Sequence, residues 1–327
     1  MRRTDDFDFP LPEELIARRP LPHREDSRMM LVDRARGTVE HRMFREFPGF
    51  IRAGDAVVFN DVRVAKARFF SNDGRAELLR LEATTPQHWR CMVRPGRRLR
   101  KGQAVEIGEA RGTVTDIMED GTRLIEWDRE VDEARHGHLA LPHYMHREDD
   151  AEDADRYQTV FARRDRSDAV AAPTAGLHFT PDIVAALPHA FITLHVGPGT
   201  FRPVKAEFIE DHVMHAERYE IAPDAAEKIE AAARRIAVGT TVARVLEHSA
   251  LTHGRVTPHA GETSIFLHPG CTFRRVDALL TNFHLPRSTL FMLVCALGGP
   301  DLLRQAYAEA VRERYRFYSY GDCMFIV

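Results

Sequence analysis

The sequence predicts an α/β protein whose main part is interrupted by an all-β segment. After residue 168, strands alternate with helices, which is typical of a sheet covered by helices. From residue 55 to about residue 140, short β-prone runs alternate with glycine-containing turns. Between these regions lies the strongly acidic stretch 148–155, "EDDAEDAD", which is too charged to be buried and therefore predicts an exposed connection at a domain boundary.

The composition narrows the function classes. With 327 residues, 44% of them hydrophobic, the chain is long enough for one large domain or two unequal ones. It contains no apolar run of about 18 residues, and its N-terminus lacks the apolar core of a secretory signal, so we expect a cytoplasmic protein. The four cysteines form no C-x-x-C pair, which argues against a disulfide framework. A net charge of −3 excludes a general polycation.

The all-β segment contains the runs "AELLRLEA", "HWRCMV", "AVEIGEA" and "RLIEWD". Asp120-Gly121 predicts a hairpin turn between two of its strands, because this pair tolerates positive φ angles. The run "RCMVRPGRRLRK" at 90–101 carries no acid. It is either a set of phosphate contacts or a solvated loop. Its candidate RNA-binding residues are Arg94, Arg97, Arg98, Arg100 and Lys101.

The main part predicts further elements in order. "FITLHVG" is typical of a strand, and helix-forming residues at helical spacing predict a helix over 223–237. Gly239 is then expected to end this helix, and "TTVARVLE" to resume as a strand. Ser288 is expected to cap a helix that stops at Gly298-Gly299, a second helix follows over 301–316, and "DCMFIV" predicts a final strand.

Polar groups gather where predicted strands end. In "AAPTAGLHFTP", Gly176 and His178 directly precede Thr180, an N-cap signal. In "LHVGPGTFRP", His195 precedes two glycines one residue apart, Gly197 and Gly199, which either let backbone N–H groups approach an anion or simply make a turn. The third glycine of a dinucleotide fingerprint is absent.

Two more segments carry candidate chemistry. "DHVMHAERYEI" places His212, His215 and Glu217 close together, which suits acid–base work, a metal site or a surface ion-pair cluster. A catalytic zinc helix would prefer H-E-x-x-H, so we expect no metal. "LLTNFHLPRSTLFMLV" places Asn282 and His284 between apolar runs, where they bind a substrate's polar groups or serve capping and packing. No G-x-S-x-G elbow or P-loop is present.

Read together, these segments resemble the S-adenosylmethionine:tRNA ribosyltransferase-isomerases of queuosine biosynthesis. The resemblance covers almost the whole chain and is densest in "AVAAPTAGLHFT", "LHVGPGTFRPV", "HVMHAERYEI", "VDALLTNFHLPRSTLFMLV" and "YRFYSYGDCMFI". It implies an α/β main domain with an inserted small antiparallel β-barrel domain. On this basis we place the main domain at 1–66 and 156–327 and the insert at 67–155.

The resemblance also implies an activity. The enzyme would move the ribosyl part of S-adenosylmethionine, a co-substrate, onto 7-aminomethyl-7-deazaguanine at the wobble position of a tRNA anticodon, giving epoxyqueuosine and releasing adenine and methionine. No further cofactor and no membrane partner is implied, and we expect a monomer. The implied partner is the tRNA anticodon stem-loop, which the basic run would contact through phosphates.

The residues that match the family's motifs can meet the demands of this chemistry. The sulfonium acidifies the neighbouring 5′ carbon, so a base near neutral pKa is needed, and His195, His212 and His215 are candidates. Glu217 or Asp322 suits the loss of adenine. The remaining candidates, for substrate binding, are His178, Gly197, Gly199, Thr200, Asn282 and His284.

Three positions depart from the family's usual pattern: Val62, Lys66 and His143. They motivate an alternative, a non-catalytic RNA-binding relative of this family. A metal-dependent hydrolase that uses His212, His215 and Glu217 is a third hypothesis.

Overall fold

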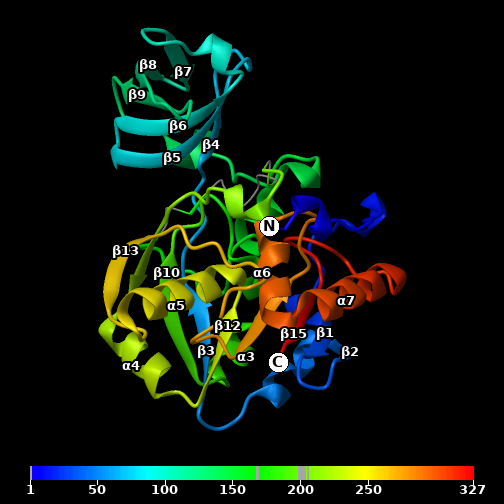
Figure 1. Cartoon of the computed structure of the whole chain (residues 1–327). Coiled ribbons are helices and arrows are strands. Elements are labelled where there is room, and N and C mark those ends of the chain that lie inside the picture. Colours follow the sequence, from blue (N-terminus) through cyan, green and yellow to red (C-terminus); the bar gives the residue numbers. More distant parts are fainter. Residues whose placement is uncertain (1, 167–168, 198–203, 205) are drawn as a thin grey trace.

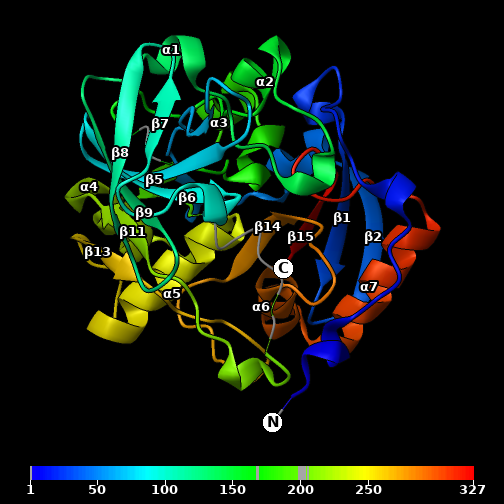
Figure 2. The same cartoon turned by 90° about the horizontal axis from the view of Figure 1, so that it is seen from above.

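The computed structural model describes residues 2–166, 169–197, 204 and 206–327. Its larger part is built on a nine-stranded mixed sheet, and its smaller part on a six-stranded antiparallel sheet. Figure 1 shows the smaller part standing above the larger one, and Figure 2, seen from above, shows it over the half of the large sheet that carries β11 and β13. The predicted fold class, an α/β main domain with an inserted small β-barrel, is confirmed.

The large sheet has the order β13-β11-β10-β3-β12-β14-β15-β1-β2. Strands β10, β3, β12 and β14 run parallel to one another, so their carboxyl ends share one edge. The strands are β1 (Arg28–Asp33), β2 (Thr38–Met43), β3 (Asp55–Asn60), β10 (His189–Leu194), β11 (Glu217–Ile221), β12 (Arg234–Val238), β13 (His259–Thr263), β14 (Ala278–Asn282) and β15 (Cys323–Ile326).

Both faces of the large sheet are covered. On one face Val58 packs in a core with the long helices, and on the other face its neighbours Val57 and Phe59 pack with the short helical segments Phe44–Phe50 and Thr174–His178. This alternation is what a strand buried on two sides requires. The helices are α1 (Glu133–His136), α2 (Ala151–Arg156), α3 (Pro181–Ala185), α4 (Pro223–Ala231), α5 (Thr240–His253), α6 (Thr289–Gly298) and α7 (Pro300–Arg312).

The insert has its own core around Trp89 and Trp127, whose rings lie 5.0 Å apart. Its sheet is nearly closed, because the backbone N–H of Asn72, just after β4, donates to the carbonyl of Glu106 in β7 at 2.8 Å. The predicted hairpin turn is confirmed, with Gly121 at φ 82°. The strands, in the order β4-β5-β6-β9-β8-β7, are β4 (Arg68–Phe70), β5 (Glu77–Thr85), β6 (His88–Arg94), β7 (Ala104–Ile107), β8 (Ala110–Ile117) and β9 (Arg123–Trp127).

The predicted elements over 223–253 need correction. The helix expected to run to residue 237 ends at Ala231, and the next residues form β12 in the middle of the sheet. The segment expected as a strand is the helix α5, which begins after Gly239. Tertiary packing overrides propensity here, because Ile236 and Ala237 point to opposite buried faces, and β-branched residues of α5 pack on the sheet at helical spacing.

The acidic stretch 148–155 is not the fully exposed connection that its charge predicts. Asp153 is completely buried, because Arg147 and the hydroxyl of Tyr320 both bind its carboxylate. Tyr320 donates its hydroxyl hydrogen to Oδ1 at 2.7 Å. The residues on either side of the acidic stretch, among them Leu141, Met145 and Tyr157, pack in one core with residues of the main part such as Ala172 and Tyr320. The division of the chain at 66/67 and 155/156 stays a prediction.

Asp153 therefore fastens the return from the insert to the C-terminal region. Replacing it, Asp153→Ala, should lower the free energy of unfolding by about 3–5 kcal/mol, because the guanidinium of Arg147 is left without its buried partner. Urea unfolding followed by circular dichroism measures the change. The matched control is Glu152→Ala, at a half-exposed side chain on the same helix, which should leave the midpoint unchanged. Equal effects of the two variants would contradict this role.

Candidate functional site

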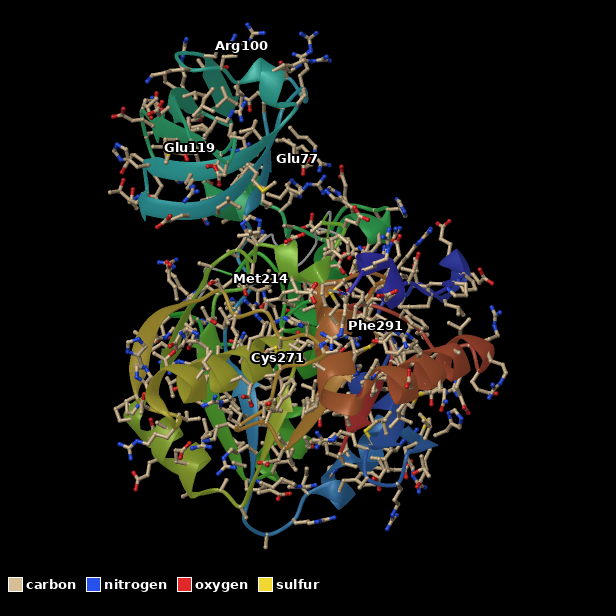
Figure 3. The ribbon with its side chains drawn as sticks, in the orientation of Figure 1. Glu77, Arg100, Glu119, Met214, Cys271 and Phe291 are labelled. Atoms are coloured by element: carbon tan, nitrogen blue, oxygen red, sulfur yellow. The ribbon has the colours of Figure 1, made fainter. Side chains whose placement is uncertain are left out.

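A cleft of about 890 Å³ lies between the insert and the carboxyl edge of the large sheet. In Figure 3, Glu77 marks the side of the insert that faces the main part, and Met214 marks the upper edge of the main part. Open α/β sheets commonly bind ligands outside the carboxyl ends of their strands. The sheet of the insert lines the cleft with Arg68, Glu77, Leu79, Leu81, Glu82, Arg90, Met92, Arg94, Asp120 and Thr122, and the segment that follows this sheet adds residues 140–143. The main part lines the cleft with residues around 195–197 and 211–218 and with Arg244.

Glu217 links three segments at this cleft. It is the first residue of β11 and is only 7% exposed. One carboxylate oxygen accepts a hydrogen bond from the backbone N–H of Gly197 at 2.9 Å, and the other accepts from Nη1 of Arg244 on α5. The carboxylate thus fixes where the chain leaves the end of β10. The predicted binding residues Gly199 and Thr200 lie outside the described residues.

Three predicted histidines line the same cleft: His195, His212 and His215. The backbone N–H of His195 donates to the carbonyl of Arg218 at 2.9 Å, which extends the pairing of β10 with β11. The ring of His212 is partly buried, with its centroid 5.5 Å from that of Phe266. Burial, followed by the nearby charge of His215, lowers the pKa of His212. His212 is therefore a neutral imidazole near pH 7, able to accept a proton.

The segment that carries these histidines gives no support to a metal-dependent hydrolase. Within the described ranges no group of three or more His, Cys, Asp or Glu side chains is arranged to hold a metal ion. Glu217, one of the three ligands that hypothesis needs, is already bound to Gly197 and Arg244. The expectation that the site holds no metal stays a prediction.

The other predicted binding residues form a second, buried cluster that does not line the cleft. His178 Nδ1 lies 2.7 Å from Ser27 Oγ, and its Nε2 lies 3.2 Å from Oδ1 of Asn282. The amide nitrogen of Asn282 donates to the carbonyl of Tyr318 at 2.9 Å. Burial lowers the pKa of His178 to about 4. These contacts hold together segments that are distant in the chain, and a substrate-binding role for His178 and Asn282 stays a prediction.

Asp322 and His284 have the same character. Burial raises the pKa of Asp322, whose two oxygens accept the backbone N–H groups of Arg28 and Arg316. His284 Nε2 lies 2.8 Å from Thr281 Oγ1, and burial lowers its pKa to about 3. The sequence analysis named His284 for substrate binding and Asp322 for the loss of adenine, and the structure buries both side chains within the main part. Both roles stay predictions.

The basic run divides into two parts. Arg94 lies at the end of β6 and lines the cleft, whereas Arg97 and Arg98 lie in the short helical turn that follows. Figure 3 shows Arg100 at the outer end of the insert, away from the main part. Lys101 forms an ion pair with Asp116 at 3.1 Å. Arg90, at the start of the run, pairs with Asp120 at 2.9 Å. The other arginines of the run have no ion pair with a residue that the structure describes, so their charges are available to a partner.

The sequence missed Arg244 as a residue of the cleft. It lies in the segment that was expected to be a strand, and no motif marks it. The first turns of a helix that follows a buried parallel strand lie at the ligand-binding edge of the sheet. Had α5 been predicted as a helix after β12, Arg244 would have been a candidate.

A family model described as "Queuosine biosynthesis protein" matches residues 4–326. The chain belongs to this family. An S-adenosylmethionine:tRNA ribosyltransferase-isomerase from Desulfitobacterium hafniense is 44% identical over 99% of this chain and 100% of its own length. The protein of the same name from Symbiobacterium thermophilum is 46% identical, again over 99% and 100%. These findings confirm the resemblance that the sequence motifs indicated.

The queuosine biosynthesis family also has a solved structure that resembles this chain. The crystal structure of S-adenosylmethionine tRNA ribosyltransferase from Thermotoga maritima is 34% identical, covers 98% of this chain and 100% of its own, and has a TM-score of 0.57. Among the helices that the structure describes, none combines the length and the apolar character needed to cross a membrane.

The buried histidine His284 should make stability depend on acid. In the unfolded chain it takes up a proton below about pH 6.5, whereas in the fold it resists protonation until about pH 3. Its contribution to stability is therefore complete above pH 6.5 and is lost as the pH falls from 6.5 towards 3. In His284→Gln, the free energy of unfolding should fall by several kcal/mol less between pH 6.5 and pH 3 than in the unmodified protein. Urea unfolding at stepwise pH measures this difference.

The control for this pH series is His23→Gln, a substitution of an exposed histidine, which should leave the slope unchanged. A slope that stays the same in His284→Gln would show that this imidazole is not the group that resists protonation.

Proposed function

We propose that this member of the queuosine biosynthesis family is an S-adenosylmethionine:tRNA ribosyltransferase-isomerase. It transfers and isomerises the ribosyl part of S-adenosylmethionine onto 7-aminomethyl-7-deazaguanine at the tRNA wobble position and releases adenine and methionine. The observation that carries this proposal is the cleft, which brings three histidines to one cavity between the α/β part and the insert. The full-length relatives are named as enzymes, so a non-catalytic relative is not favoured.

The reaction begins with removal of a proton from the 5′ carbon beside the sulfonium. His212 is suited to this step, because its lowered pKa keeps the imidazole neutral at pH 7 and therefore able to accept a proton. His195 and His215 line the same cleft and are positioned to hold or relay protons near the reacting groups. An imidazole that is not already protonated needs no prior proton loss before it acts.

The departure of adenine leaves positive charge on the sugar. Glu217 lines the cleft, whereas Asp322 does not, so Glu217 is the carboxylate that stabilises this charge. Its two oxygens are held by Gly197 and Arg244, and a carboxylate fixed in this way needs no reorganisation as charge develops. The reaction needs no metal or additional cofactor from the protein.

The tRNA anticodon stem-loop binds across the insert. Its wobble base is unpaired, so it can enter the cleft without the cost of opening a duplex. Arg94 acts at the cleft, while Arg97, Arg98, Arg100 and Lys101 contact phosphates along the stem, because phosphates supply most of the affinity for RNA. We propose that the enzyme works in the cytoplasm as a monomer.

Incubation of the protein with S-adenosylmethionine and tRNA carrying the aminomethyl base tests this function. Adenine and methionine should be released, and mass spectrometry of the digested tRNA should show the added cyclopentene-diol epoxide. Unchanged tRNA would contradict the proposal.

The same assay tests whether His212 is the base that removes the proton from the 5′ carbon. His212→Asn should lower kcat by about 10²- to 10⁴-fold, because an amide cannot accept the proton, while the Kd for tRNA should change little. The matched control is His253→Asn, at an exposed histidine near the end of α5, which should retain full turnover. If His212→Asn keeps full turnover, another cleft histidine is the base.

The basic run should govern RNA affinity. Arg97→Ala combined with Arg98→Ala should weaken tRNA binding at low salt and reduce the slope of log Kd against log salt by about 1 to 2, because up to two phosphate contacts are lost. Fluorescence anisotropy with labelled tRNA measures both quantities, and turnover at saturating tRNA should be retained.

Arg129→Ala is the matched control for this RNA-binding test. Arg129 is an exposed arginine of the same insert, but it lies near the carboxylates of Glu109 and Asp128. An equal loss of affinity in this control would mean that general charge, rather than the basic run, attracts the tRNA.

A further inference from the structure

Arg244 carries a hydrogen-bond donor whose partner is missing. The residue lies one turn inside α5, lines the cleft and is only 5% exposed. Its Nε donates to the carbonyl of Ile265 at 3.2 Å, and its Nη1 donates to Glu217. Its Nη2 is shielded from solvent and has no hydrogen-bond partner among the residues that the structure describes. Two of the three guanidinium nitrogens are thus satisfied by the fold, and the third is not.

This unsatisfied donor calls for an explanation. A buried charged donor without an acceptor is costly. Arg156, Arg166 and Arg316 each have such a nitrogen too, but of these arginines only Arg244 lines the cleft. If Arg244 served only to hold Glu217, Nη2 would gain nothing from its place at the cleft. A ligand acceptor that arrives with the substrate accounts for both the burial and the position.

The chemistry of the site selects the kind of acceptor. A guanidinium binds carboxylate and phosphate oxygens best, because its planar N–H groups match their geometry. Arg244 is too deeply buried to meet the phosphodiester backbone of a folded RNA, which stays on the outside of a stem. The tRNA wobble base that enters the cleft carries neither a carboxylate nor a phosphate on its ring. A carboxylate acceptor must therefore belong to a small molecule that can enter the cleft.

S-adenosylmethionine has one such group, the carboxylate at the end of its amino-acid chain. The same end carries an ammonium group, and the sulfonium follows a few bonds away. Next to Arg244 lies the carboxylate of Glu217, which complements those positive charges. The ion pair of Arg244 and Glu217 at the cleft therefore offers a positive group to the carboxylate and a negative group to the ammonium of an amino acid.

We propose that Arg244 binds the carboxylate of the amino-acid end of S-adenosylmethionine through Nη2, with Glu217 holding the guanidinium in place. This inference rests on the proposed function and adds a substrate-binding residue to it. It places the amino-acid end against α5 and leaves the 5′ carbon nearer the histidines of the 211–216 segment. The sequence analysis named Asn282 and His284 for substrate binding, but both side chains are buried within the main part, away from the cleft.

Binding of two ligands tests the proposal. Isothermal titration calorimetry without tRNA compares S-adenosylmethionine with its decarboxylated analogue, which keeps the sulfonium and amine but lacks the carboxylate. The unmodified protein should bind the analogue about 10- to 100-fold more weakly. Arg244→Gln should weaken the binding of S-adenosylmethionine but not that of the analogue, so that the two Kd values lie within about threefold of each other.

Arg235→Gln is the matched control, because Arg235 is also ion-paired, with Asp277 at 3.1 Å, but does not line the cleft. It should keep the full preference for S-adenosylmethionine. If Arg244→Gln fails to fold, the double substitution Glu217→Gln with Arg244→Gln removes both buried charges together and should also lose the preference.

The outcomes separate the two proposals. If the unmodified protein binds both ligands equally, or if Arg244→Gln keeps the preference, the assignment of Arg244 is overturned and the proposed function stands. If Arg244→Gln instead weakens only the binding of tRNA, the acceptor is a phosphate and the assignment is also overturned. If the unmodified protein binds neither ligand without tRNA, the assignment of a site formed by the protein alone is overturned. The proposed function fails only if S-adenosylmethionine and tRNA together give no adenine release.

Discussion

The ion pair between Glu217 and Arg244 is the contact on which the rest of the site depends. It joins the start of β11 to α5, and through Gly197 it also fixes the chain at the end of β10. Both partners are almost fully buried, so loss of either one would leave an unpaired charge at the base of the cleft. The three segments therefore keep one relative position, and the histidines between β10 and β11 are held over the same cavity.

The polar groups named above form two layers, one at the cleft and one buried within the main part. The cleft layer, with His212 and Glu217, faces space that a substrate can enter. The buried layer, with His178 and Asn282, faces other protein segments and is satisfied by them. Burial lowers the pKa of His178 and of His212, but only His212 lines the large cleft, whereas the cavity beside His178 measures about 20 Å³. Location, rather than residue type, separates the two roles.

The sequence predicted the architecture well and the site only in part. Residues such as Ser288, which caps α6, and Gly121, which turns a hairpin, act through local geometry that a short stretch determines. Arg244 and Asp153 act through contacts 27 and 167 residues away along the chain, to Glu217 and Tyr320. No local pattern encodes such a pairing. The helix α5 was missed for the same reason, because packing on the sheet outweighed its β-branched residues.

The central claim is that S-adenosylmethionine occupies the cleft between the insert and the carboxyl edge of the sheet. Hydrogen–deuterium exchange with and without S-adenosylmethionine tests this most directly. S-adenosylmethionine alone should protect the peptides that cover 211–218 and 240–246, and the peptide that covers 96–101 should be protected only after tRNA is added. Protection confined to the peptides around Ser27, His178 and Asn282 would contradict it.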